Sequence, residues 1–139
     1  MILFGVVNIY MMQERRFGVF NNDNKFDVDL AKAKIREEEL VDILGKAKLE
    51  IKTDSIWKDS KNLAVEFRCR NKPSGISTSQ AQYYAFILDA NGYTEGIIFI
   101  PIEKLKILAR KFYKLGKVVN GGDDKASEMV LVPISEFVK

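Results

Sequence analysis

Two segments with the apolar spacing of a helix alternate with strand-like segments, and this order limits the folds open to the chain. In the first segment, apolar residues recur at near-helical spacing from Leu30 to Leu44, and Gly45 follows as a stop signal. In the second, "PIEKLKILARKFYKLG", Pro101 stands where a first helical turn tolerates it and Gly116 marks the end. Because helices separate strands, the pattern favours an α/β sheet covered on both faces.

The strand-like segments have either alternating or continuous apolar character. We expect one domain over residues 1–139, since about 100 to 200 residues is usual for a domain. In it, a pair of strands within residues 1–26 precedes a core over 27–139, which is a central mixed β-sheet flanked by helices. The predicted strands are 2–10, 16–20, 48–54 ("KLEIKTD"), 63–69, 81–88 ("AQYYAFIL"), 96–100 ("GIIFI") and 129–134 ("MVLVPI").

The chain contains no histidine, which excludes several classes of chemistry. Ser-His-Asp and Cys-His catalysis, histidine general bases and histidine-based zinc sites are unavailable. Any catalysis must therefore use carboxylates, lysines, hydroxyls or hard metal ions. The net charge of +3 is too small to indicate nucleic-acid binding, so the distribution of charge has to decide that question.

Cysteine content and apolar runs bear on location. The single cysteine, Cys69, cannot form an internal disulfide, which suits a reducing, intracellular setting. The N-terminal stretch "MILFGVVNIYMM" has no positive leader and falls short of the ~18 apolar residues of a membrane span. We therefore expect an intracellular protein with no membrane partner.

Two carboxylates and an arginine stand at the ends of successive strands. Asp54 closes one strand, Glu66 lies in the next, and Arg68 follows two positions later, so a period of two predicts that Glu66 and Arg68 face the same way. If short connections make the strands neighbours, Asp54 and Glu66 converge. Converging carboxylates repel unless a cation such as Mg²⁺ joins them. The alternative is that these charges are simply solvated.

Further residues can complete such a site. Glu37 lies on the apolar stripe of the first helix, where a carboxylate is costly unless it is paired or bound to a metal. Its neighbours Glu38 and Glu39 point away from the stripe. Arg68 is the positional candidate for stabilising developing charge, and the alternatives are Lys52, Lys58 and Lys72.

An acid on a leading helix, then Asp, then Glu-x-Lys on consecutive strands is the motif order of the PD-(D/E)XK nuclease superfamily, which this chain resembles. The superfamily includes the Holliday-junction resolvases. Three stretches, "EIKTD", "NLAVEFRCRNKPSGISTSQAQYYAFIL" and "VVNGGDDKASEMVLVPI", look more closely like small phage and viral proteins assigned to it. The resemblance covers roughly residues 35–135 and implies a restriction-endonuclease-like core of the order α-β-β-β-α-β. A viral source would place the protein in the cytoplasm of a host cell.

Carried over by position, the resemblance implies Mg²⁺- or Mn²⁺-dependent hydrolysis of DNA phosphodiester bonds, with a homodimer as one possible assembly. Asp54, Glu66 and Glu37 would bind the metal, and Arg68 occupies the usual lysine position. Arginine stays protonated and cannot accept a proton as a lysine of depressed pKa can. Lys72 would supply the missing amine if the loop "NKPSG" folded back. The motif's proline is also replaced, by Thr53.

Nucleic-acid contacts are predicted on the second helix and on the loop after the Glu66 strand. The helix has lysines and arginines on its polar side and can follow a phosphate backbone, although solvated helix faces are commonly basic too. Ser74 and Gly75 offer a hydroxyl and an accessible backbone N–H to a phosphate; a plain turn is the alternative. The residues assigned to these contacts are Arg70, Ser74, Lys111 and Lys114.

Two other functions stay open at this point. A catalytically impaired protein of the same fold would bind nucleic acid or a partner protein without cleaving, since fold does not dictate activity. A small interaction protein would carry its charges merely as solvated groups.

Gln80 and Tyr84 match the Gln-x-x-x-Tyr spacing of RecB-like nucleases, but a core position explains Tyr84 equally well.

Overall fold

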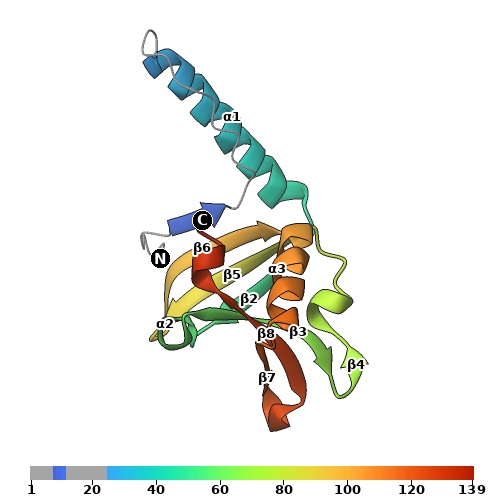
Figure 1. Ribbon diagram of the computed structural model, residues 1–139. Helices are drawn as coiled ribbons and strands as arrows, with labels where there is room; N and C mark the ends of the chain where they lie inside the picture. The colour runs from blue at the N-terminus through green and yellow to red at the C-terminus, as the bar shows by residue number, and fades with distance from the viewer. Residues whose placement is uncertain (1–7, 12–24) are drawn as a thin grey trace.

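The computed structural model describes residues 8–11 and 25–139, and the side chains from residue 32 onward (Figure 1). The predicted strand over 16–20 lies outside the described residues. The helices are α1 (Lys25–Lys46), α2 (Trp57–Ser60) and α3 (Ile102–Lys114), with 3-10 turns η1 (Gly75–Ser77), η2 (Asp123–Lys125) and η3 (Ile134–Glu136). The strands are β1 (Asn8–Met11), β2 (Leu49–Asp54), β3 (Asn62–Cys69), β4 (Lys72–Pro73), β5 (Tyr83–Ala90), β6 (Tyr93–Pro101), β7 (Val118–Gly121) and β8 (Ser127–Pro133).

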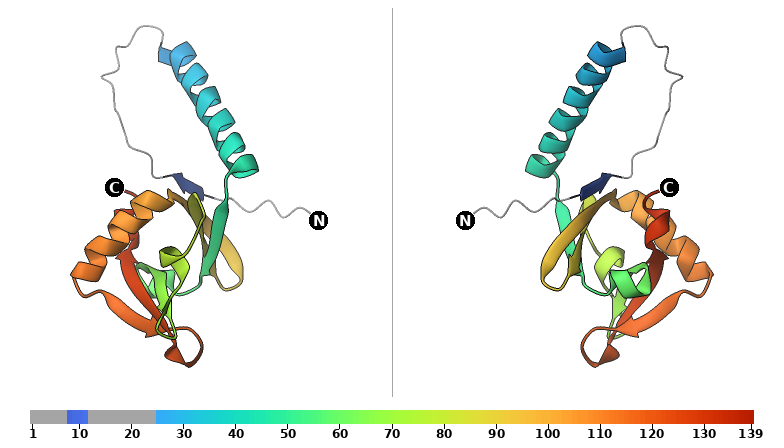
Figure 2. Two further views of the ribbon diagram at one scale, coloured as in Figure 1. Left: turned by 90° about the vertical axis from the view of Figure 1, so that its right-hand side faces the viewer. Right: turned by 90° about the vertical axis from the view of Figure 1, so that its left-hand side faces the viewer.

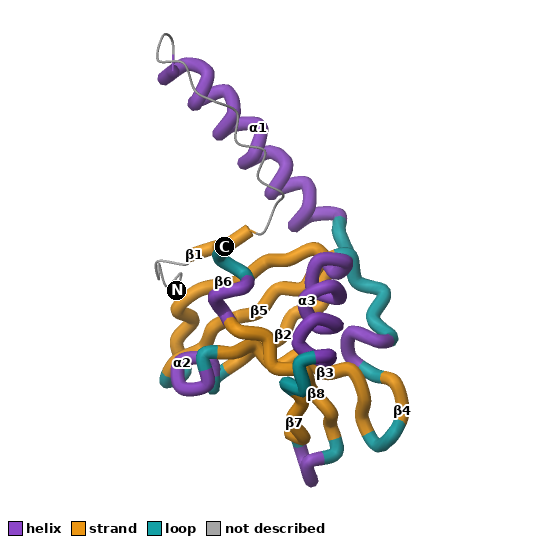
Figure 3. Tube along the Cα trace, in the orientation of Figure 1, coloured by secondary structure: helices purple, strands orange, loops and turns teal. Residues whose placement is uncertain are grey.

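The strands form two sheets, not the single central sheet that the sequence led us to expect (Figure 3). The first sheet has the order β1-β6-β5-β2, in which β1 is parallel to β6, β2 is parallel to β5, and β5 is antiparallel to β6. The second sheet, β4-β3-β8-β7, is antiparallel throughout. The predicted mixture of helices and strands in one small domain is confirmed. The difference arises because β3 pairs with β8, distant in sequence, and not with β2.

One hydrophobic core joins both sheets and α3. Alternation along β5 buries Tyr84, Phe86 and Leu88 on one face of the first sheet. Helix α3, the second of the two helices predicted from the sequence, forms because its apolar residues recur at helical spacing and its polar residues reach water. The second sheet and α3 contribute to this core Leu63, Val65, Val130, Val132, Ile102, Leu105, Ala109 and Phe112.

Helix α1 extends away from both sheets (Figures 1 and 2). It ends at Lys46, beside the predicted stop at Gly45. Its apolar residues Ile35, Val41 and Leu44 are 55%, 72% and 49% exposed, so the stripe that we expected to face the sheet is not covered by the described part of the chain. Charged residues run along α1, and none of the helices within 25–139 is long and apolar enough to cross a membrane.

Candidate carboxylate site between the two sheets

Asp54 links the end of β2 to the start of β3, although these strands belong to different sheets. Its Oδ1 atom accepts a hydrogen bond of 2.9 Å from the backbone N–H of Ile56, which fixes the turn into α2. Its Oδ2 atom makes a long contact of 3.5 Å with the backbone N–H of Ala64 on β3. The half-buried carboxylate therefore holds the two strand edges together at this point.

A pocket of about 210 Å³, here called the carboxylate pocket, lies between these strand edges. The two sequence-predicted acids Asp54 and Glu66 both line it, without their strands being paired. The wall is formed by residues from β2, β3, β5 and β8 and by the first residue of η1. Those used below are Lys52, Asp54, Glu66, Gly75 and Tyr84.

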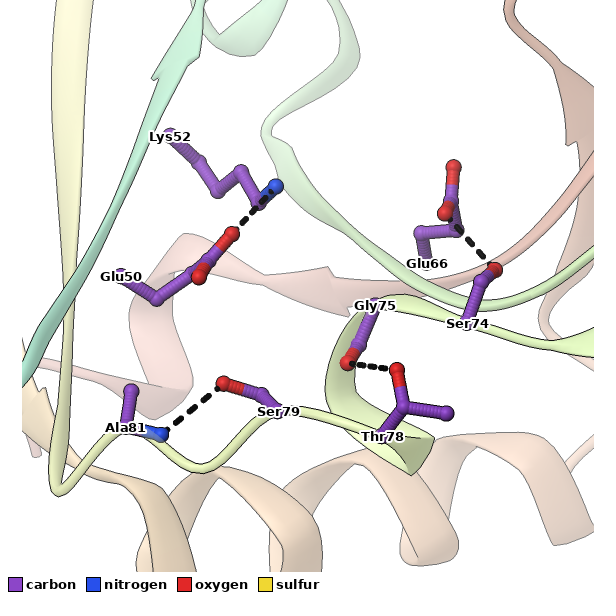
Figure 4. A network of polar contacts seen from close by, with 8 residues as sticks. All are labelled: Glu50, Lys52, Glu66, Ser74, Gly75, Thr78, Ser79 and Ala81. Carbon is purple, nitrogen blue, oxygen red and sulfur yellow. Dashed lines mark hydrogen bonds and ion pairs between the residues drawn. The ribbon is translucent and has the colours of Figure 1, made fainter.

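The Glu66 carboxylate is held in its ionised form by hydroxyl groups. The pKa of Glu66 lies below its ordinary value, chiefly because of a hydrogen bond with the Ser127 side chain. Burial opposes this shift, while the Ser74 hydroxyl, which donates to Oε1 at 2.8 Å, and the positive charge of Lys52 add to it (Figure 4). The carboxylate is therefore negatively charged at neutral pH and suited to a cation.

The loop that carries Ser74 packs directly on the strand that carries Glu66. The Ser74 N–H donates to the Phe67 carbonyl at 3.1 Å, and the Ser77 hydroxyl donates to the same oxygen at 2.8 Å. Gly75 follows with φ +52°, a left-handed conformation that suits glycine. Ser74 was predicted as a phosphate contact; the structure shows its hydroxyl directed instead to Glu66.

Lys52 is the cation of the carboxylate pocket. Its Nζ atom lies 2.7 Å from Oε1 of Glu50, and Figure 4 shows it across the gap from Glu66. The pKa of Lys52 is raised, mainly by the hydrogen bond to Glu50 and against the effect of burial, with Glu66 contributing at longer range. Lys52 is therefore a fixed positive charge at neutral pH.

Arg68 lies outside the carboxylate pocket, because a β-bulge interrupts β3. Glu66 pairs with Met129 and Arg68 with Glu128, so Phe67 is an extra residue between them. The expected alternation, which would place Glu66 and Arg68 on one face, is thus broken. Arg68 lines a different hollow beside Phe67, and its Nη1 atom lies 3.3 Å from Oε2 of Glu128.

Two further predicted site residues also lie away from the carboxylate pocket. Glu37 is exposed on α1, where it borders a shallow hollow with residues of that helix only. Lys72 is exposed in β4, opposite Cys69, because the chain reverses in a two-residue turn. Arg70 and Asn71 form this turn at φ 49° and 62°, the left-handed geometry of a tight hairpin. The loop does not fold Lys72 back to Glu66.

The other lysines and arginines predicted to stabilise charge or to contact nucleic acid lie in different surroundings. Lys58 forms an ion pair with Glu95. Lys111 lies 3.4 Å from the Glu136 carboxylate, whereas Lys114 lines the hollow that contains Arg68. Arg70 is exposed at the hairpin tip.

The hydroxyl of Tyr84 is a polar atom left without a partner in the carboxylate pocket. Tyr84 is 2% exposed, and its oxygen has no hydrogen-bond partner among the described residues. Burial raises the pKa of this phenol, and the nearby Ser79 hydroxyl, which does not meet the geometry of a hydrogen bond with it, opposes part of the shift. A buried hydroxyl without a partner is costly and is expected to bond a bound water or ligand.

Sequence reasoning missed the part played by Glu50, Ser127 and the hydroxyl of Ser74. The period of two in "EIKTD" held a usable signal, since it places Glu50, Lys52 and Asp54 on one face of β2. No local signal marks Ser127, which reaches Glu66 through the long-range pairing of β3 with β8.

The donor set of the site is small. Among residues 32–139 no group of three or more Asp, Glu, Cys or His side chains is placed to hold a metal together. The pocket offers two carboxylates and a phenol hydroxyl.

Comparisons with protein-family models, with curated proteins and with solved structures found no match to this chain.

Proposed function

We propose that this protein is a nuclease that hydrolyses DNA phosphodiester bonds with a divalent cation, Mg²⁺ or Mn²⁺, held by Asp54 and Glu66. One observation carries the proposal: both carboxylates line the same pocket, beside the fixed positive charge of Lys52. A restriction-endonuclease-like core and membership of the PD-(D/E)XK superfamily belong to the same proposal. Their support is the order of the motifs along the chain.

The residues present fit such a cation. Mg²⁺ prefers oxygen ligands and usually takes only one or two protein carboxylates beside water and substrate phosphate. Oδ2 of Asp54 has only its 3.5 Å contact with Ala64, so lone pairs remain available. Glu66 is ionised at neutral pH because its pKa is lowered. Glu37 would not be needed as a ligand, since Mg²⁺ usually keeps several water molecules.

Each residue of the pocket then has a distinct role. When bound, the cation polarises a phosphate ester and lowers the pKa of a water molecule. Lys52 stabilises negative charge that develops on the phosphate, but it does not accept a proton, because its raised pKa keeps it protonated.

The test is cleavage of end-labelled single-stranded, duplex and branched DNA in Mg²⁺ or Mn²⁺. We expect cleavage by the wild type, its abolition by EDTA, and a loss of about a hundredfold or more in Asp54→Asn and Glu66→Gln. Asp59→Asn is the matched control, because Asp59 is an exposed acid of α2 that does not line the pocket. Undiminished cleavage by Glu66→Gln would overturn the proposed mechanism.

A second function, nucleic-acid binding without cleavage, is favoured by one observation. Both oxygens of Asp54 already contact backbone N–H groups, so this carboxylate has a structural role that needs no metal. Such a protein would show salt-sensitive affinity for DNA in the presence of Mg²⁺ and leave the DNA intact. The same cleavage assay, combined with a binding measurement, separates the two.

A further inference from the structure

A second hollow in the described part of the chain lies on the other side of the β3 bulge. It has a volume of about 530 Å³ and runs between α3 and the β3–η1 segment; we call it the α3 groove. The bulge at Phe67 directs Arg68 into it, and five residues of α3 form the opposite wall. The lining residues used below are Phe67, Arg68, Lys106, Arg110, Tyr113 and Lys114.

The α3 groove is strongly cationic. Four of its lining residues are lysines or arginines and none is acidic. Arg68 is paired with Glu128, and Lys106 lies 3.2 Å from Glu103. Neither Arg110 nor Lys114 forms an ion pair with any residue in the part of the chain that the structure describes. Two uncompensated cations on successive turns of one helix suit a polyanion, because neighbouring phosphates repeat along a chain.

An exposed aromatic side chain stands in the same groove. Tyr113 is 52% exposed and meets Phe67 edge to face, with ring centroids 5.5 Å apart and an interplanar angle of 84°. This contact fixes the tyrosine ring. A fixed, exposed ring beside free cations is the arrangement by which proteins bind single strands, where bases stack on aromatic side chains and basic residues follow the backbone.

We propose that the α3 groove binds single-stranded nucleic acid, with a base stacked on Tyr113 and phosphates contacted by Arg110 and Lys114. A duplex keeps its bases stacked inside and offers no base face to a tyrosine unless a nucleotide is flipped out. This inference adds to the proposed function by naming the single-stranded form of the substrate. In this respect it rests on the proposed function. Binding itself requires no metal, so the two can be tested apart.

The groove adjoins the carboxylate pocket. Gly75 lines the pocket, and the next residues, Ile76 and Ser77, line the groove. On β3, Glu66 belongs to the pocket and Phe67 to the groove. A nucleic-acid strand held in the groove therefore lies beside the pocket, with only β3 and η1 between them.

The test is fluorescence anisotropy of a labelled oligothymidylate of about 12 nucleotides, titrated with full-length protein in EDTA. The double variant Arg110→Gln/Lys114→Gln is compared with Lys104→Gln/Lys117→Gln, which removes the same charge from the same region but leaves the groove lining intact. We expect the groove variant to bind about tenfold or more weakly, and the control to lose less than about threefold. Equal losses would overturn the proposal, because binding would then reflect net charge alone.

A second pair of variants tests stacking. Tyr113→Ala should lose about tenfold in affinity, whereas Tyr93→Ala, which removes a tyrosine that is 75% exposed and outside the groove, should lose nothing. Circular dichroism checks that each variant is folded. A duplex of the same length that binds as tightly as the single strand would also contradict the proposal. Retained binding without any cleavage would remove the proposed nuclease function and leave the groove assignment standing.

Discussion

A Cβ atom placed on Gly75 would lie 2.2 Å from the carbonyl oxygen of Glu66. The first residue of η1 thus rests on the backbone of β3 with no room for any side chain, and it does so at a positive φ. This contact sets the position of Ser74 and, through the Ser74 hydroxyl, of the Glu66 carboxylate. The glycine of "KPSGI" is therefore part of the scaffold of the carboxylate pocket.

The first prediction concerns this contact. Gly75→Ala should lower the free energy of unfolding by about 2 to 4 kcal/mol, since it adds a steric clash to the strain of a positive φ. Gly92→Ala is the control: Gly92 has φ +81° but nothing within 4 Å of its Cβ position, so only strain of about 1 kcal/mol is expected. Urea unfolding measures both. Equal losses would show that the contact is looser than described.

The second prediction concerns the pKa of Glu66. Ser127→Ala should raise this pKa toward its ordinary value, because the hydrogen bond with Ser127 is the largest cause of its lowering. Ser74→Ala should raise it by less. Carboxyl carbon shifts, followed by NMR against pH, give the midpoints. A midpoint unmoved in Ser127→Ala would contradict this account, and exposed Ser135→Ala serves as the control.

The same lowered pKa makes stability depend on pH. A carboxyl whose pKa is lower in the folded state stabilises the protein fully above its unfolded-state pKa, and this stabilisation is lost as the pH falls through the folded-state value. The difference in free energy of unfolding between the wild type and Glu66→Gln should therefore shrink as the pH is lowered from above the unfolded-state pKa of Glu66 to below its folded-state pKa. Urea titrations at a series of acid pH values measure it.

Much of the fold was predictable from local patterns, whereas its sheet pairing was not. Helical spacing predicted α1 and α3, alternation predicted β2, and a continuous apolar run predicted β5, because these patterns are properties of single segments. The division into two sheets depends on β3 pairing with β8. No local pattern records which strands pair, since any two apolar strands satisfy the same periodicity.

The candidate site was predictable only in part, for a related reason. Asp54 and Glu66 could be singled out because strand ends carried unexpected charge, and both line one pocket. Arg68 was expected beside Glu66 on the strength of strict alternation, which the bulge at Phe67 interrupts. The position of Glu37 was inferred from an apolar stripe, but in the structure the same stripe is exposed.

The third prediction separates Lys52 from Arg68. On the proposed function, Lys52→Gln should reduce the single-turnover rate of cleavage about ten- to a hundredfold, because it removes a positive charge from the carboxylate pocket, and Lys52→Arg should retain most of the rate. Arg68→Gln should weaken binding of the single strand and leave the rate at saturating protein unchanged, since Arg68 lines the α3 groove. If Arg68→Gln lowered the cleavage rate and Lys52→Gln did not, Arg68 and not Lys52 would take the role of the motif's lysine.

The fourth prediction concerns the hydroxyl of Tyr84. Because it has no hydrogen-bond partner within the described residues, Tyr84→Phe should leave the free energy of unfolding unchanged or raise it by up to about 1 kcal/mol. The neighbouring Tyr83→Phe, which keeps the stacked contact with Phe99, is the control. Chemical denaturation measures both. A loss of stability of more than about 1 kcal/mol in Tyr84→Phe would reveal a hydrogen bond that the structure does not contain.

The central claim is that Asp54 and Glu66 together hold one divalent cation, and calorimetric titration of the intact chain with Mn²⁺ tests it most directly. The account predicts one ion bound per chain, with an affinity about tenfold or more weaker in both Asp54→Asn and Glu66→Gln and unchanged in Asp59→Asn. Wild-type affinity in both pocket variants, or no binding of Mn²⁺ by the wild type, would contradict it.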